Sequence, residues 1–339
     1  MTKIGVLSYN VRYANRGDHH DAWHDRRDAV ARLVRFHQPD IAAFQEPVPE
    51  QRRDLRERLP SYEFVGRGRN PGGDGEGCPI AVDADRWEVV DDGTFWLSET
   101  PEEPSTDWNA AHPRIATWVH VRGVSTSGET ATNEPGSDLA SDAATATAAP
   151  AFLLINTHFD HVSAQARRES ARLLRDRLTA LARSVSTATA GVQSGANGRE
   201  DEGKAGDIDS MLPVVFVGDL NCTPGSVPHR VLLGDDPETA DAADRDRADA
   251  GTTTAGTSDP DATGDPQPID LRDAAAAADL RHGPETSLTD FARLIDGRRI
   301  DHALVSPAFE VEAFATLADR DDRGRYPSDH LPILSRLEL

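Results

Sequence analysis

The sequence has little cysteine and no long hydrophobic run. Cys78 and Cys222 are the only cysteines among 339 residues, too few for a disulfide framework or a cysteine-rich zinc site. No apolar run approaches the roughly 20 residues that span a membrane. Met1 leads at once into the apolar residues 4–7, without room for a signal peptide. We therefore expect a reduced, cytoplasmic protein that has no membrane partner.

Positive charge is also scarce. The chain has 36 Lys and Arg against 58 Asp and Glu, which gives a formal net charge of −22, and only two of the basic residues are lysines. Such a surface repels nucleic acids and anionic lipids. The same composition is typical of halophilic proteins, which stay soluble in concentrated salt, where charges are screened beyond a few ångströms. We favour the halophilic interpretation, which makes net charge a poor guide to the substrate.

Three stretches have few aromatic or branched apolar residues. Residues 124–150, 185–211 and 238–268 consist mainly of Ala, Thr, Ser, Gly, Asp and Glu. They cannot bury enough apolar surface to offset the entropy lost on ordering. The remainder suits one large α/β domain. We therefore expect a single domain over residues 1–339 with three low-complexity surface insertions.

Short apolar runs that end in polar residues alternate with amphipathic segments, which predicts an α/β fold. Buried strands are expected at residues 3–12, 41–44, 152–155, 214–217 and 298–306. Helices are expected at residues 24–37, 50–59 and 163–183. Residues 85–97 are expected to form a hairpin-like pair of strands.

The strand at residues 214–217 is followed by Gly218-Asp219-Leu220-Asn221. In an extended chain, Asp219 and Asn221 point to the same side. A carboxylate and a carboxamide at a strand end are typical of a site for a hard cation or a polarised water. They are equally typical of a turn in which the two side chains cap their own backbone. This motif alone does not distinguish the two interpretations.

Polar residues recur at the ends of several predicted strands. Each alone is more often structural, but eight together, with two histidines and four carboxylates, favour one cluster at the rim of a sheet sandwich. Oxygen donors without cysteine favour Mg²⁺ or Mn²⁺ over zinc. The eight are Asn10, Glu46, His158, Asp219, Asn221, Asp301, Asp329 and His330.

Six motifs follow one another along nearly the whole chain, and together they resemble the DNase I-like endonuclease/exonuclease/phosphatase family. They are Ser8-Tyr9-Asn10-Val11-Arg12, Gln45-Glu46, Asn156-Thr157-His158-Phe159-Asp160, Gly218-Asp219-Leu220-Asn221, Ile300-Asp301-His302 and Ser328-Asp329-His330. The resemblance implies a four-layer α/β/β/α sandwich of two mixed β-sheets flanked by helices. It also implies hydrolysis of a phosphate ester that depends on Mg²⁺ or Mn²⁺.

The resemblance further implies a role for each residue that matches a family motif. Glu46 would bind the metal, with Asn10 beside it and Asp329 contributing. Asp219 would orient or deprotonate the attacking water. Asn221 would hold Asp219 or a phosphoryl oxygen.

The other matching residues would act on the phosphate. His330 would contact the phosphate, with Asp301 fixing its tautomer. His158 would stabilise negative charge in the transition state. Glu76 and Arg114 resemble phosphate-contacting positions of some members.

One departure from the family pattern is Arg12, because nuclease members often carry an acid at that place. The sequence shows no basic stripe beyond residues 67–69 and the arginines of the helix at 163–183, which favours a small phosphate ester or a nucleotide over nucleic acid. We expect a monomeric hydrolase of phosphate esters. The competing hypothesis is a non-catalytic relative that acts as a binding or scaffold protein, which would lose site residues that this sequence retains.

The halophilic interpretation makes a prediction about salt. We expect folding and activity to persist at molar KCl and to weaken at low salt, because repulsion among the excess acidic groups is then unscreened. A salt titration of activity, with circular dichroism in parallel, measures both effects. Full activity at low salt and its loss at molar salt would contradict the interpretation.

Overall fold

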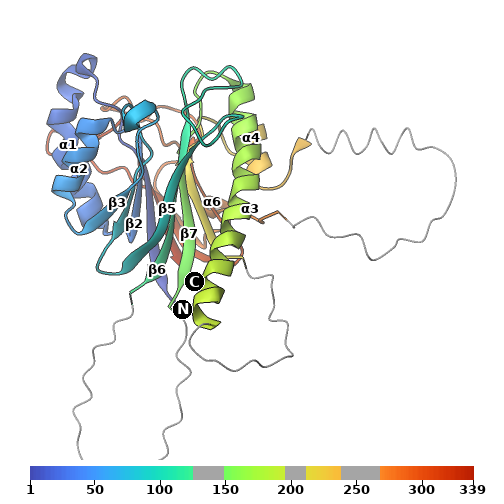
Figure 1. The fold of residues 1–339 in the computed structure, drawn as a ribbon. Coiled ribbons are helices and arrows are strands. Elements are labelled where there is room, and N and C mark those ends of the chain that lie inside the picture. Colours follow the sequence, from blue (N-terminus) through green and yellow to red (C-terminus); the bar gives the residue numbers. More distant parts are fainter. Residues whose placement is uncertain (125–148, 195–210, 238–267) are drawn as a thin grey trace, which may run out of the picture.

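The computed structural model describes residues 1–124, 149–194, 211–237 and 268–339, with only the backbone described for 185–194. Most of each predicted insertion, namely residues 125–148, 195–210 and 238–267, lies outside the described residues. The described part forms two mixed β-sheets packed face to face, with helices on both outer faces (Figure 1). The α/β/β/α sandwich predicted from the family motifs is confirmed.

The first sheet has seven strands within the described residues. Their order is β10 (Leu280–His282), β12 (Glu310–Thr316), β13 (Ile333–Glu338), β1 (Lys3–Asn10), β2 (Ile41–Gln45), β4 (Ile80–Asp83) and β3 (Tyr62–Val65). Helices α1 (Trp23–His37) and α2 (Pro49–Arg58) cover its outer face. Alternate apolar residues along each strand explain the two faces, since Leu7 packs under α1 while Val6 points into the inter-sheet core.

The second sheet has six strands within the described residues. Their order is β5 (Trp87–Trp96), β6 (Ile115–Gly123), β7 (Ala151–His158), β8 (Val214–Asp219), β11 (Asp301–Val305) and β9 (Arg272–Asp273). Helices α3 (Ala164–Ser194) and α4 (Val227–Leu232) cover its outer face, opposite α1 and α2 in Figure 1. Short helical segments η1 (Arg16–Asp21), η2 (Pro71–Gly73) and α6 (Ala274–Ala277) complete the described elements.

The strand register gathers the polar strand ends at one edge. In the first sheet, β1 and β2 are parallel and pair Asn10 with Gln45, so Glu46 follows directly. In the second sheet, parallel β7 and β8 pair His158 with Asp219. Antiparallel β11 begins opposite β8, which places Asp301 beside Asp219.

Two predictions about local structure are wrong. Residues 85–97 form one strand, β5, instead of a pair, and β5 runs antiparallel to β6 along its whole length. Gly93, which resembles a turn residue, lies under the Trp118 indole, where a Cβ would come within 2.7 Å of Nε1. Its small size therefore serves packing. Helix α3 also continues to Ser194, beyond its predicted end near Arg183.

No helix among the described residues is both long and apolar enough to cross a membrane.

Candidate functional site

A cavity of about 390 Å³ opens at the sheet edge where the polar strand ends meet. Four carboxylates and three guanidinium groups face it, so charged groups dominate the wall. The lining residues are Arg12, Tyr13, Glu46, Arg69, Glu76, His112, Arg114, His158, His161, Asp219, Asn221, Asp329 and His330.

Asp219 is the most deeply buried carboxylate of the wall. Its Oδ1 accepts a hydrogen bond from the Asn221 backbone N–H at 2.9 Å, and its Oδ2 accepts one from Asn10 Nδ2 at 3.0 Å. Burial raises the pKa of Asp219 to about 7, because a charged carboxylate is costly away from water. Gly218 allows the close strand approach, since a Cβ there would lie 2.1 Å from the Thr157 carbonyl oxygen.

Asn10 links Asp219 to the second carboxylate, Glu46. Asn10 Nδ2 also lies 2.9 Å from Glu46 Oε1, and Glu46 Oε2 accepts a hydrogen bond from the Tyr13 backbone N–H at 2.9 Å. Glu46 directly follows the end of β2, has a left-handed backbone with φ of 73° and lines the cavity. Strain of this kind is common where function fixes a side chain.

His330 lies between two buried carboxylates. Its Nδ1 is 2.9 Å from Asp301 Oδ2, and its Nε2 is 3.7 Å from Asp219 Oδ2. Burial favours the neutral imidazole, but the Asp301 and Asp219 carboxylates outweigh it and raise the pKa of His330 well above its usual value. The Asp301 and Asp219 carboxylates therefore stabilise His330 as an imidazolium, and its Nε2–H faces the cavity.

His158, unlike His330, is a neutral imidazole, because no carboxylate outweighs the effect of burial on its pKa. Burial, with the nearby Arg114 guanidinium, lowers the pKa of His158 well below its usual value. Asn221 Nδ2 donates to the Phe159 carbonyl oxygen at 2.9 Å and lies 2.9 Å from His158 Nε2. Since that amide nitrogen is a donor, Nε2 accepts, and the imidazole proton sits on Nδ1.

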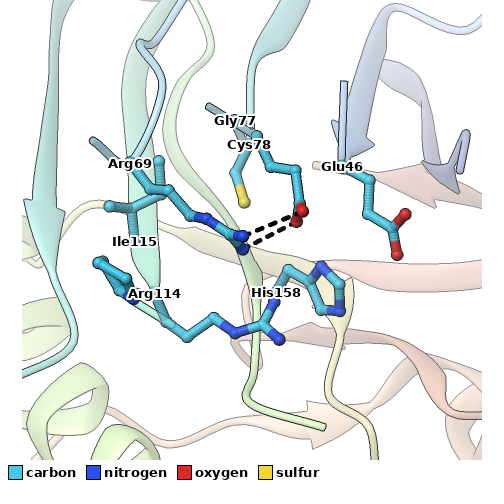
Figure 2. A pocket seen from close by; sticks show the side chains of 9 residues that line it. Glu46, Arg69, Gly77, Cys78, Arg114, Ile115 and His158 are labelled. Atoms are coloured by element: carbon cyan, nitrogen blue, oxygen red, sulfur yellow. Dashed lines mark hydrogen bonds and ion pairs between the residues drawn. The ribbon is translucent and has the colours of Figure 1, made fainter. Parts of the chain in front are cut away.

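Basic side chains form the far wall of the cavity. Figure 2 shows Arg69, Arg114 and His158 converging, and its dashed lines mark two Arg69 bonds to Glu76, at 2.8 and 3.0 Å. Burial raises the pKa of Glu76 despite this fork. Arg114 Nη2 lies 2.9 Å from His161 Nδ1.

Asp329 and Arg12 close the cavity on the side of Glu46. Arg12 Nη1 lies 3.2 Å from Asp329 Oδ2, and Arg12 also contacts Asp18. Burial, together with repulsion from Glu46, raises the pKa of Asp329. Glu46 and Asp329 are carboxylates, whose hard oxygens are typical ligands of divalent cations. Asn10 turns its amide nitrogen toward Glu46, while its Oδ1 accepts a hydrogen bond from the Arg12 backbone N–H at 2.9 Å.

The structure brings all ten sequence-predicted site residues to this cavity, eight on its wall. Asn10 and Asp301 lie behind the wall, where they hold Asp219 and His330. Their functional roles remain predictions. The other five residues of the wall were not predicted as site residues; they are Arg12, Tyr13, Arg69, His112 and His161.

The turn after β7 explains why His161 was missed. If the chain continues in extended form after β7, the alternation of side chains predicts Asp160 on the side of His158 and His161 on the other side. Instead, the Asp160 carboxylate accepts backbone bonds from Val162 and Ser163, at 2.9 and 2.7 Å, and closes a turn. The turn brings His161 to the cavity. The sequence does contain a signal for this turn. Asp160 stands three residues before Ser163, which caps α3, and an Asp at that spacing often accepts backbone hydrogen bonds in a turn.

Comparisons with known proteins agree with this geometry. A sequence profile described as the endonuclease/exonuclease/phosphatase family matches residues 7–330. A crystal structure of an endonuclease/exonuclease/phosphatase family protein from Bacteroides thetaiotaomicron is 28% identical, with a TM-score of 0.71 over 100% of this chain and 99% of that chain. The structure of a mannosyl-6-phosphatase from B. thetaiotaomicron VPI-5482 is 27% identical, with a TM-score of 0.71 over 99% and 100%.

A curated relative is the uncharacterized protein L388 of Acanthamoeba polyphaga mimivirus. It is 30% identical over 110 residues, which are 30% of this chain and 41% of that protein. The matched region thus spans less than half of the viral protein.

The His330–Asp301 pair makes a prediction about protonation. Asp301→Asn replaces an anionic acceptor by a neutral one, so the imidazolium loses stabilisation and the pKa of His330 falls by about one pH unit or more. Histidine-selective NMR titration of the metal-free protein measures this change. His302 is the internal control, because burial lowers its pKa to about 3 and it should stay neutral above pH 4. An unchanged His330 titration would contradict the pairing.

Proposed function

Because the chain belongs to the endonuclease/exonuclease/phosphatase family, we propose that it is a divalent-metal-dependent phosphatase of small phosphate monoesters. The family relationship supports phosphoester hydrolysis in general. One observation carries the finer proposal, namely that a carboxylate with a raised pKa, Asp219, faces the same cavity as the Glu46 carboxylate and the His330 imidazolium.

The metal proposal rests on the donor set around Glu46. Glu46 and Asp329 would hold the ion, with Asn10 beside them. A bound Mg²⁺ or Mn²⁺ would supply Lewis-acid stabilisation of the negative charge on a phosphoryl oxygen. Arg12 already neutralises part of the Asp329 charge, so Glu46 is the principal ligand.

Asp219 is the proposed general base. A pKa of about 7 suits proton abstraction near neutral pH, because the group is ionised in part and still basic. The Asn10 and Asn221 donors hold its two oxygens in a fixed orientation. A water beside Asp219 would lose its proton to the carboxylate as its oxygen attacks phosphorus and the bond to the leaving oxygen breaks.

Two imidazoles are placed to hold the phosphoryl oxygens. His330 offers Nε2–H from an imidazolium that Asp301 orients, and His158 offers Nδ1–H from a neutral ring. Donors fixed before the reaction need little reorganisation as charge develops on these oxygens. Arg114 adds a permanent positive charge at the same cavity.

The polar wall favours a small hydroxylated substrate. Apart from the histidines, the one aromatic ring among the lining residues is Tyr13, and the Arg12 guanidinium lies over it at 4.9 Å. A nucleobase normally stacks on an exposed aromatic face. The polar groups of the wall suit sugar hydroxyls, and a neighbour 27% identical to this chain is described as a mannosyl-6-phosphatase. Sugar phosphates are therefore the substrates that we propose first.

Asp219→Asn tests the catalytic assignment. It keeps the shape of the side chain but removes the base, so kcat for p-nitrophenyl phosphate with Mg²⁺ or Mn²⁺ should fall by about 10³-fold or more. Asp92→Asn, at an exposed position on β5, is the matched control and should keep wild-type kcat.

The same assay distinguishes substrate classes. Activity on mannose 6-phosphate above that on bis-p-nitrophenyl phosphate and plasmid DNA supports the proposal. Preference for the diester or the plasmid overturns the substrate class. If the wild type hydrolyses no phosphate ester, the proposal that the protein is an enzyme is wrong, and the scaffold hypothesis is favoured.

Glu46→Gln tests the metal assignment. Loss of a direct carboxylate ligand should raise the metal concentration for half-maximal activity by at least about tenfold, since even outer contacts contribute this much. High Mn²⁺ should restore part of kcat. Glu63→Gln, on the exposed edge strand β3, should leave the metal dependence unchanged. An identical metal titration for Glu46→Gln would remove Glu46 from the metal site.

A further inference from the structure

A second polar cluster lies behind the turn that carries Asn221. Four buried side chains form this cluster, which we call the buried quartet: His229, Asp273, Arg299 and His302, exposed by 4, 7, 6 and 0%. His302 follows Asp301 on β11, and neighbouring strand residues point to opposite faces. On β11, Asp301 therefore bonds His330 on one face of the sheet, while His302 belongs to the buried quartet on the other face.

The buried quartet contacts both ends of the turn between β8 and α4. His302 Nε2 lies 2.8 Å from the Cys222 carbonyl oxygen and donates to it. At the other end, the Gly225 backbone N–H donates to His229 Nδ1 at 3.3 Å. The turn that follows Asp219 and Asn221 is thus held by one backbone acceptor and one backbone donor.

An ion pair between Asp273 and Arg299 links the two histidines, through the ring nitrogen of each that does not contact the turn. His229 Nε2 is 3.0 Å from Asp273 Oδ2, and Arg299 Nη2 bonds the same oxygen. Arg299 Nη1 lies 3.2 Å from His302 Nδ1. Both histidines are neutral with the proton on Nε2, so every ring nitrogen has a partner. The four side chains form an open chain of hydrogen bonds, from His229 through Asp273 and Arg299 to His302, and each end of this chain bonds the backbone of the turn.

A metal site is the alternative for these residues. Ligand atoms of His229, Asp273 and His302 lie within 4.8 Å of one another. However, the Arg299 guanidinium bonds the carboxylate that would bind the ion, and both imidazoles already use both nitrogens. A cation there would displace the Arg299 charge and break the contacts to the turn.

We propose that the buried quartet is a positioning unit that clamps the turn 220–226 and so fixes Asp219 and Asn221 for phosphoester hydrolysis. This inference rests on the proposed function. Asn221 has a left-handed φ of 48°, and its backbone and side chain bond Asp219 and His158. A clamp at Cys222, the next residue, holds that conformation.

His302→Leu and His302→Gln form the first test. Leu removes the donor to Cys222, and the misplaced turn should lower kcat for p-nitrophenyl phosphate by about 100-fold with little change in KM, as ångström-scale misplacement does. Gln can place an amide N–H near the imidazole Nε2 position and should restore most of kcat.

His120→Leu is the matched control. His120 is also a buried histidine, 2% exposed, on β6. It lies five residues from Ile115, or about 17 Å along the strand from the cavity end. Neither ring nitrogen of His120 has a hydrogen-bond partner, so this variant should leave the melting temperature and kcat near their wild-type values. An equal loss of kcat in His120→Leu and His302→Leu, or wild-type kcat in His302→Leu, would overturn the clamp.

Hydrogen exchange of the metal-free protein gives a readout that does not need activity. Amides of the turn 220–226 should exchange faster in His302→Leu and in His229→Leu, which covers the case in which one variant fails to fold. Unchanged exchange in the folded variant overturns the clamp even if the wild type is inactive, and so separates it from the proposed function. One equivalent of bound zinc in the wild type, lost in His229→Leu, would establish the metal site instead.

Discussion

The structure depends on the burial of the Asp219 carboxylate where the two sheets meet. A carboxylate away from water is costly unless donors surround it. Here the donors come from separate parts of the chain: Asn10 ends β1, the Asn221 backbone belongs to the turn after β8, and His330 precedes β13. No single segment can supply them. The carboxylate is therefore stabilised only when both sheets pack in the observed register.

Backbone strain collects around the same cavity. Arg12, Glu46 and Asn221 all have left-handed φ values, of 55, 73 and 48°, and none is a glycine. Each such residue costs on the order of 1–3 kcal/mol, so surrounding contacts must hold it. The Tyr13 N–H bond to Glu46 and the clamped turn beyond Asn221 supply those contacts. The site thus gains a fixed geometry from the stability of the rest of the fold.

The strand ends were predictable because each buried strand is a short apolar run that stops at a polar residue, as at Asp219 and Glu46. The path of the chain beyond a strand could not be predicted, because the alternation of apolar and polar residues ends with the strand. The turn at Asp160, for example, places His161 on the side opposite to the predicted one. The buried quartet had no local signal at all, since contacts between distant segments such as His229 and Asp273 leave no periodic pattern.

The charges of the cavity explain how an acidic protein would bind an anion. All four cations of the wall have acidic partners: Arg69 bonds Glu76, Arg12 bonds Asp329, Arg114 lies 3.5 Å from Asp160 and His330 lies 2.9 Å from Asp301. A phosphate would therefore meet groups whose charge is already partly neutralised, and the proposed contacts come from Arg114 and His330. The field of a chain with net charge −22 opposes that approach at low salt. In molar salt the Debye length falls to about 3 Å, so only groups in contact with the substrate act on it. The halophilic interpretation and the site are therefore compatible, because screening removes the distant repulsion and leaves the local attraction.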